Sequence, residues 1–304
     1  MKEIIIVEFP SNLGLIEPSK GHEPGVRKLP SWLREHGFHE LIGPAEIHSL
    51  EAPTYTMQVD PVSGVRNADA IIQYSKDQAD LIQKIIAPGK ILFVLGGDCS
   101  ILTGNALALK KLGNYGLFFL DGHTDFITPE LSGTAGAAGM DLAIVTGHGH
   151  PKLTNIDGLK PYIEEENCYC VSNREYDEDY ERPVKESSVR YLDLLSLRNI
   201  GIENCVVDFQ KMVEAKGLNG YWVHIDVDVL DDEQMPAVDS RTAGGLSYNE
   251  FNSMLRLLMS HPKFTGLEIT ILDPELDPDG KHTRKFVQQF CDTANSVRTN
   301  AKVD

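Results

Sequence analysis

Short apolar runs alternate along the chain with longer segments in which apolar residues recur at helical spacing. Consecutive apolar positions are typical of strands that are buried on both faces of a parallel sheet. An α/β fold of three α-β-α layers is therefore predicted, with helices on both faces of a mainly parallel sheet. The predicted strands are residues 4–7, 91–95, 116–120, 168–171, 222–225 and 266–272.

Capping and breaking residues set the expected helix boundaries. Apolar stripes predict helices over 67–86 and 100–112, each followed by a glycine turn. Ser247 and Glu250 have the spacing of a capping box, and they open a helix that ends before Pro262. A closing helix is predicted over 284–297, and loops over 10–30, 127–141, 172–186 and 231–246.

The chain has 304 residues, 41% of them hydrophobic, which is enough for one large α/β domain. No linker-like segment divides it, so a single domain over 1–304 is expected. No window approaches the roughly eighteen apolar residues of a membrane span, and residues 1–7 are interpreted as a first strand rather than a signal peptide. A membrane partner is therefore not expected.

Charge and cysteine content narrow the partners and the compartment. The formal net charge is −17 and no basic patch could neutralise phosphates, so a nucleic-acid partner is not expected. The same negative field favours a small cationic substrate. Five cysteines at uneven spacing do not form a disulfide framework in a chain of this length, which favours a reducing cytoplasm. Cys168 and Cys170 are interpreted as buried thiols.

Two motifs place metal-ligand side chains directly after predicted strands. Asp121, His123 and Asp125 lie at every second position, so strand alternation would point all three to one face. Asp226 and Asp228 repeat this pattern about a hundred residues later. Carboxylates with an imidazole suit a divalent metal, and two such clusters suit a pair of ions.

Either motif alone is more often a loop that caps a helix. Together they favour metal, because burying several carboxylates without a counter-charge is very costly. The carboxyl ends of parallel strands meet at one edge of a sheet, so the motifs could share a site. A tight Gly96-Gly97 turn after the strand 91–95 would bring Cys99 to the same edge.

In this order the motifs resemble those of the ureohydrolase superfamily of arginases, agmatinases and formimidoylglutamases. Residues 96–100 are similar to its GGDHS turn, 121–125 to its DAHxD motif and 226–232 to its DVDxLDP motif. The resemblance covers nearly the whole chain and implies an arginase-like fold and a homo-oligomer. Flanking segments agree at Gly25-Val26-Arg27, Asn173-Arg174-Glu175, Gly244-Gly245-Leu246 and residues 266–269.

The resemblance also implies a binuclear centre, with manganese as the expected metal. In this pattern Asp121 and Asp226 bridge two ions, Asp125 serves the first, and His123 and Asp228 serve the second.

The sixth ligand position, an imidazole in most members of the superfamily, is Cys99 in this chain. A thiolate can ligate, and a nearby dication would lower the pKa of its thiol. Sulfur is also softer, so the preference could shift from manganese toward zinc, iron, cobalt or nickel. The alternative is that Cys99 only packs and that the first ion is weak or absent.

The chemistry that the resemblance implies is hydrolysis of a guanidino or formimino carbon by a metal-bridging hydroxide. Asp125 would hydrogen-bond the hydroxide and relay a proton to the leaving nitrogen.

Three positions depart from the arginase pattern. Ala138 stands where arginases carry a proton-shuttling histidine, and Ile271 where arginases and agmatinases carry the glutamate that holds the guanidinium. Ile127 stands where arginases place an asparagine that reads the carboxylate of the amino acid. L-Arginine is therefore not expected to be the substrate.

Several side chains are candidates for compensation. Asp239 lies in a loop that borders the substrate pocket in the family, and a solvated loop acid is an equally plain interpretation. Asp177, with Glu178, resembles loop acids that contact substrate, against a rim salt bridge as the alternative. His148 and His150 could replace the missing shuttle, although paired loop histidines are more often surface residues.

The leading interpretation is a metal-dependent hydrolase of C–N bonds in a linear amidine, cationic or polar, other than arginine. The alternative is a catalytically silent relative whose metal site has a structural or ligand-sensing role. The changes at Ala138 and Ile271 favour the alternative, whereas the retained acidic and imidazole ligands favour the enzyme. Amide hydrolysis, as in deacetylase relatives of the fold, lacks support from the histidine and aspartate spacing.

Overall fold

The computed structural model describes residues 2–300, and its strands form one eight-stranded sheet. The strand order is β2-β1-β3-β8-β7-β4-β5-β6, and every neighbouring pair is parallel. The strands are β1 (Glu3–Phe9), β2 (Glu46–Ser49), β3 (Lys90–Gly96), β4 (Tyr115–Leu120), β5 (Cys168–Val171), β6 (Arg190–Leu192), β7 (Gly220–Asp226) and β8 (Phe264–Thr270). The predicted α/β class and the mainly parallel sheet are confirmed.

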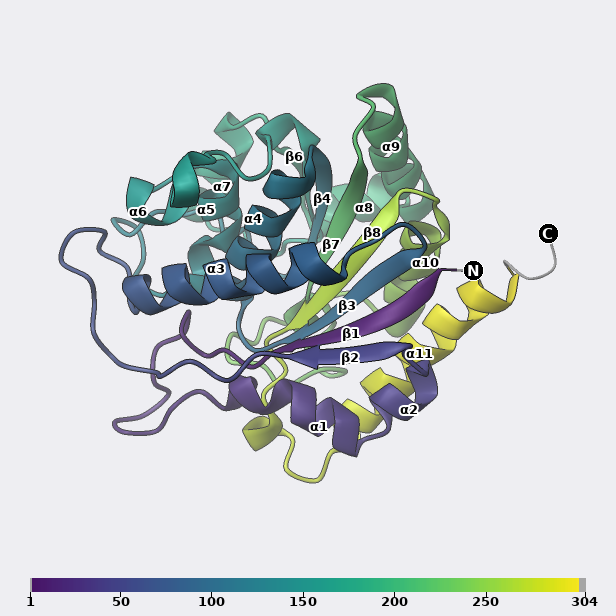
Figure 1. Ribbon diagram of the computed structural model, residues 1–304, viewed down its shortest axis with the longest axis horizontal. Coiled ribbons are helices and arrows are strands. Elements are labelled where there is room, and N and C mark those ends of the chain that lie inside the picture. The colour runs from purple at the N-terminus through teal and green to yellow at the C-terminus, as the bar shows by residue number, and fades with distance from the viewer. Residues whose placement is uncertain (1, 301–304) are drawn as a thin grey trace.

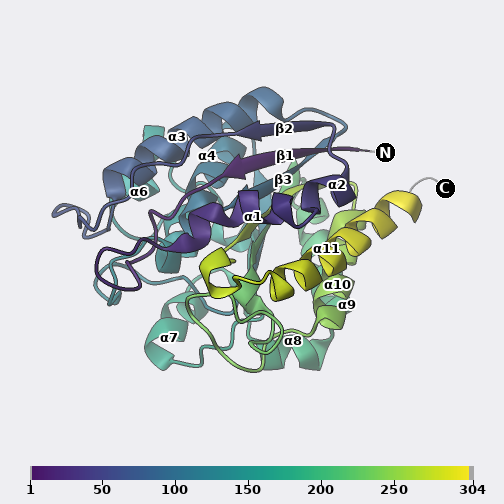
Figure 2. The same ribbon diagram turned by 90° about the horizontal axis from the view of Figure 1, so that it is seen from below.

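Helices cover both faces of the sheet (Figure 1, Figure 2). One face carries α3 (Ala68–Ile85), α4 (Leu102–Leu112), α5 (Asp141–Thr146) and α6 (Pro151–Thr154). The other carries α1 (Leu29–Glu35), α2 (Phe38–Ile42), α8 (Leu194–Ile200), α9 (Ile202–Ala215), α10 (Tyr248–Ser260) and α11 (Lys281–Asn300). The short helix α7 (Glu178–Glu186) follows β5.

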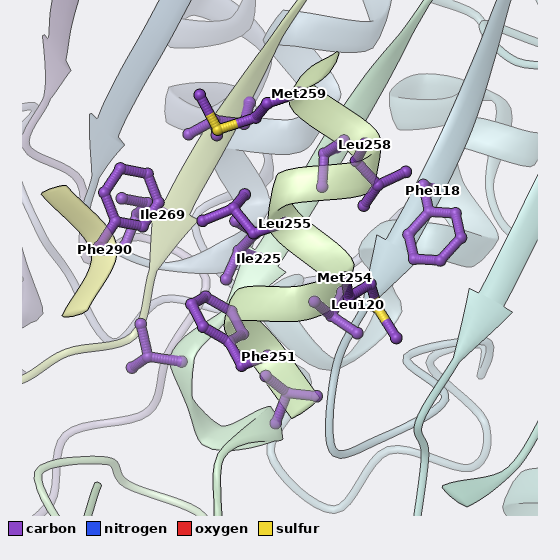
Figure 3. Packing of buried hydrophobic residues seen from close by; sticks show 14 of the residues in the cluster. Phe118, Leu120, Ile225, Phe251, Met254, Leu255, Leu258, Met259, Ile269 and Phe290 are labelled. Atoms are coloured by element: carbon purple, nitrogen blue, oxygen red, sulfur yellow. The ribbon is translucent and has the colours of Figure 1, made fainter. Parts of the chain in front are cut away.

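Helix α10 shows how the sequence pattern places a helix. Its capping box is formed by Ser247 and Glu250 as predicted. Its apolar side chains Phe251, Leu255 and Leu258 are buried against the sheet, as Figure 3 shows. Burying a side chain of this size is worth about 1.5–3 kcal/mol, so this face fixes the helix on the sheet.

The structure adds two strands and a helix that were not predicted, and it shortens one predicted strand. The edge strands β2 and β6 were not predicted, and α7 occupies part of the predicted loop 172–186. The last strand ends at Thr270 rather than at residue 272, because Ile271 adopts a φ of 74°. That left-handed conformation cannot continue a strand and is costly for a β-branched side chain.

The order of the strands positions the candidate site. Strands β4 and β7 are neighbours, and β3 lies two places beyond β7, across β8. The carboxyl ends of all four strands therefore meet along one stretch of the sheet edge.

Candidate metal centre and active site

Asp121 and Asp226 end neighbouring strands and build the same local turn. One oxygen of Asp121 accepts a hydrogen bond of 2.6 Å from the backbone N–H of His123, and Asp226 accepts one of 2.8 Å from that of Asp228. The predicted strand alternation of the first motif is wrong, since β4 stops at Leu120 and Asp125 has a φ of 43°. Side-chain-capped turns, rather than a pleat, collect these side chains.

His123, Asp121 and Asp228 form one group of potential ligands. His123 Nδ1 lies 2.8 Å from Asp228 Oδ2 and 3.7 Å from Asp121 Oδ1. The three side chains each offer an atom within 4.8 Å of the others. Gly122 permits this approach, because a Cβ there would lie 2.5 Å from the Arg174 guanidinium and 2.8 Å from Asp228 Oδ1.

Cys99 reaches the same place from the end of β3. A Cβ on Gly97 would lie 1.5 Å from the backbone oxygen of Ser11, so only glycine fits this turn. The thiol of Cys99 donates to Asp226 Oδ2 at 3.1 Å and lies 3.1 Å from the hydroxyl of Thr270. The predicted convergence of the three strand ends is therefore present in the structure.

His224 is a site residue that the sequence reasoning missed. Its ring stacks on Phe119 at 4.4 Å, and its Nδ1 lies 2.6 Å from Glu268 Oε1. Cys99, Asp121 and His224 each offer an atom within 4.8 Å of the others, so they form a second group that shares Asp121 with the first. The signal was present, because His224 lies two positions before Asp226 on a strand.

Asp141, the first residue of α5, is a second residue that was missed. Its side chain is fully buried, and its Oδ2 lies 3.9 Å from His224 Nε2. Asp121 Oδ2 lies 3.7 Å from the same nitrogen. These separations are too long for good hydrogen bonds, and neither oxygen nor the nitrogen has a partner among the described residues.

Closely spaced buried acids shift the pKa values of this cluster. Burial and the negative charge of neighbouring aspartates raise the pKa of Cys99 and of three carboxyls well above their ordinary values. Although burial opposes its charged form, interactions with Asp121 and Glu268 raise the pKa of His224 to about 10. The crowding of buried acids and the oxygens without partners would both fit bound cations. The three carboxyls are Asp125, Asp141 and Asp226.

A cavity of about 320 Å³ opens onto both groups. Its metal-ligand side chains are Cys99, His123, Asp125, Asp226 and Asp228. Ala138, Ile127 and Ile271 also line it, so the three departures from the arginase pattern all face the same space. Glu175 and Tyr180 add polar groups that the sequence reasoning did not assign to the site.

Of the two candidate substrate-binding residues, one lines the cavity and the other does not. Asp239 lines the cavity on its exposed side, where partial desolvation and the nearby charge of Asp228 raise the pKa of its carboxyl. Asp177 is exposed outside the lining, because its side chain caps α7 by accepting from the N–H of Asp179.

Neither candidate shuttle histidine lines the cavity. His148 pairs with Glu165. His150 caps α6 by accepting from the N–H of Lys152. The structure therefore does not bring an imidazole from this segment to the site.

Comparison with known proteins agrees with this site. The sequence profile of the arginase family matches residues 2–294. The chain belongs to the arginase family. An arginase from Bacillus subtilis (strain 168) is 29% identical to this arginase-family chain over 225 residues, covering 74% of this chain and 75% of that protein. The predicted superfamily and the class of hydrolase acting on C–N bonds are confirmed.

Solved structures extend the similarity to the whole fold. An arginase from Bacillus caldovelox superposes with a TM-score of 0.84 at 26% identity, covering 97% of this chain and 98% of that one. A formimidoylglutamase from Bacillus subtilis gives a TM-score of 0.70 at 20% identity, covering 97% and 87%, and shows the shared fold alone.

Two further observations concern the chain as a whole. Among the described residues, no helix is both long and apolar enough to cross a membrane. All five cysteines are free and buried, in agreement with the interpretation of Cys168 and Cys170 as buried thiols.

Proposed function

We propose that this arginase-family chain is a binuclear metal hydrolase that cleaves a C–N bond of a linear amidine other than L-arginine. Asp121 and Asp226 would lie between the two ions, Asp125 and Cys99 would serve the first, and His123 and Asp228 the second. Its substrate would be a small cationic or polar guanidino or formimino compound. We further propose one domain over 1–304, a homo-oligomer, and a cytoplasmic location in keeping with the free thiols.

One observation carries this proposal. Two groups of potential ligands share Asp121, and both open onto a single cavity. A carboxylate common to two neighbouring groups is the arrangement that a pair of bridged ions requires.

The donor atoms bear on which metals would bind. Four carboxylates and His123 suit manganese, whereas the Cys99 sulfur favours zinc, iron, cobalt or nickel at the first position. When bound, the two ions would activate water as the nucleophile and stabilise the negative charge on its oxygen in the transition state.

The chain's own residues would orient the substrate and move the proton. Asp125 lines the cavity beside the ligand groups, so its carboxylate could accept a proton from water and pass it to the leaving nitrogen. Ala138 cannot take over that transfer, so Asp125 would act without the histidine of arginases. Asp239 and Glu175 would supply negative charge to a cationic amidine.

Substrate choice follows from the apolar positions in the cavity. Ile271 faces the space in which a guanidinium would need a carboxylate, and each lost charge-assisted hydrogen bond costs about 1.5–3 kcal/mol. Ile127 offers no hydrogen bond to an amino-acid carboxylate. We therefore expect negligible turnover of L-arginine, although the relatives compared above are named arginases.

A screen for urea, ammonia and formamide release tests the function. Purified protein, loaded in turn with manganese, zinc, cobalt or nickel, is assayed against guanidino and formimino compounds with L-arginine as reference. Asp228→Asn serves as the matched variant expected to lose activity. Release from a compound other than arginine, lost in Asp228→Asn, supports the proposal.

Two results would contradict it. Efficient arginine cleavage would overturn the argument from Ile271 and Ile127. Metal binding without hydrolysis of any compound would favour the alternative, a silent relative with a structural or sensing role.

A further inference from the structure

We propose that His224 supplies the imidazole of the first metal position, so that this ion is held by Cys99, Asp121 and His224, with Asp141 as a fourth ligand. The inference rests on the proposed metal pair, and it replaces Asp125 and Asp226 by His224 and Asp141 as ligands of the first ion. It moves the imidazole from the turn after β3 to the interior of β7.

The first argument is the register of the sheet. Trp222, His224 and Asp226 alternate with the core positions of β7 and face the α4 side of the sheet. His224 is paired in register with Glu268 of β8 and lies across from Phe119 of β4. The imidazole is thus one layer beneath Asp121 and Asp226, at the inner end of the same cluster.

The second argument is the set of partnerless atoms. Asp121 Oδ2 and Asp141 Oδ2 lie 3.7 Å and 3.9 Å from His224 Nε2. All three atoms are buried, and none has a hydrogen-bond partner among residues 2–300. Leaving such groups unpaired is unfavourable, because they have lost their hydrogen bonds to water. A single cation between them would satisfy all three at once.

The third argument is distance. With metal–nitrogen and metal–oxygen bonds of about 2.0–2.2 Å, neighbouring ligand atoms of a tetrahedral site lie roughly 3.3–3.6 Å apart. The separations from His224 Nε2 exceed this by a few tenths of an ångström, which small side-chain rotations can close. The sulfur of Cys99 lies within 4.8 Å of both Asp121 and His224 ligand atoms, on the same scale.

The fourth argument is the support behind the imidazole. Histidines that bind metal usually direct their other ring nitrogen to a carboxylate, which fixes the tautomer. His224 Nδ1 lies 2.6 Å from Glu268 Oε1, and Asn105 donates to the other oxygen of Glu268. This arrangement leaves Nε2 directed at the aspartates.

The donor set also predicts which metal binds. One thiolate, one imidazole and two carboxylates in tetrahedral array suit zinc or cobalt better than manganese. The competing interpretation is that His224 stays protonated and serves as a buried counter-charge to Asp121. The two interpretations differ in whether metal replaces the proton on Nε2.

Cobalt titration of metal-free protein separates them. We expect two binding events, one with a thiolate-to-cobalt charge-transfer band that Cys99→Ser abolishes. His224→Gln should lose that band or weaken its binding event at least about tenfold. His39→Gln is the matched control, because His39 is also buried and lies 3.0 Å from a glutamate, Glu8.

A milder variant and a direct measurement distinguish the loss of a metal ligand from misfolding of the His224→Gln variant. Glu268→Gln keeps the imidazole and should weaken the same event by about 10–100-fold. X-ray absorption of protein with one equivalent of zinc should show one sulfur near about 2.3 Å and one imidazole, lost in His224→Gln. The thiolate-to-cobalt band and the cobalt affinity could instead be unchanged in both His224→Gln and Glu268→Gln. That result would overturn the inference and favour a protonated His224 that serves as counter-charge to Asp121.

The two proposals fail separately. Cobalt bound through Cys99 and His224 without hydrolysis of any amidine would reject the proposed function and keep this ligand set. Amidine hydrolysis with cobalt binding unaffected by His224→Gln would support the proposed function and reject this ligand set.

Discussion

The two ligand groups that meet at Asp121 differ in depth. The side chain of His123 is 17% exposed and faces the cavity, and the hydroxyl of Ser240 lies 3.2 Å from its Nε2. His224 is fully buried and is closed in by Phe119 and Glu268. We call these the outer group (Asp121, His123, Asp228) and the inner group (Cys99, Asp121, His224).

This difference in depth coincides with a difference in how closely each group follows the arginase-like motifs. The outer group keeps the residues that the arginase-like motifs specify. The inner group combines a thiol from one motif with an imidazole that lies in no motif. The proposed ions should therefore respond differently to substitution, and the predictions below test that asymmetry from the largest effect to the smallest.

Asp121→Asn removes the carboxylate that both groups share. We expect loss of both binding events and a fall in kcat/KM of roughly a thousandfold, or about 4 kcal/mol. Metal analysis and steady-state kinetics measure the two effects. Asp277→Asn is the control, because this buried aspartate caps α11 through Thr283 and belongs to neither group. Retention of two ions in Asp121→Asn would show that the groups share no ligand.

His123→Gln should affect the outer group alone. We expect one of two cobalt-binding events to weaken by about a hundredfold, because a ligand is lost outright. The thiolate-to-cobalt band from Cys99 should persist at full intensity. Disappearance of that band would mean that the two groups do not bind independently.

Cys99→His should affect the inner group alone. Replacing the soft sulfur by nitrogen should raise manganese affinity at the first position by about tenfold. Titration followed by electron paramagnetic resonance of free manganese measures this change. Unchanged affinity in a folded variant would show that Cys99 is not a ligand.

Asp239→Asn should give the smallest effect, on the outer side of the site. Because partial desolvation and the charge of Asp228 raise the pKa of this carboxyl, it gains its negative charge at a higher pH than an ordinary aspartate. The KM for a cationic amidine should therefore fall as the pH rises through that raised pKa, and the variant should lack this dependence. We expect KM to increase only about threefold to tenfold, since the cavity mouth is solvated.

Much of the fold could be predicted because its central strands are apolar on both faces. Residues 91–95, 116–120 and 222–225 lie within the observed strands β3, β4 and β7. Strand β2 was missed because its four residues are mostly exposed and carry Glu46 and His48, which break the apolar pattern. Helix α7 was missed because it is mainly charged and contains Pro183.

The candidate site was predictable only as far as its ligands follow strand ends. Asp121, His123 and Asp228 stand out in the sequence because charge there interrupts an apolar run. His224 and Glu268 lie inside strands, where a single polar residue is easily taken for a satisfied core group. Asp141 is brought to them by the start of α5, and no local pattern marks that long-range contact.

Burial of the inner group affects how and when a metal ion can reach it. The exposed fraction of Cys99 is 1%, and those of Asp121, Asp141 and His224 are zero. Among these residues Cys99 alone lines the cavity, so an ion would enter past its thiol and exchange more slowly than at the outer group. Metal supply while the chain folds would then select the ion. The metal found in purified protein would record the conditions of its synthesis rather than an equilibrium preference.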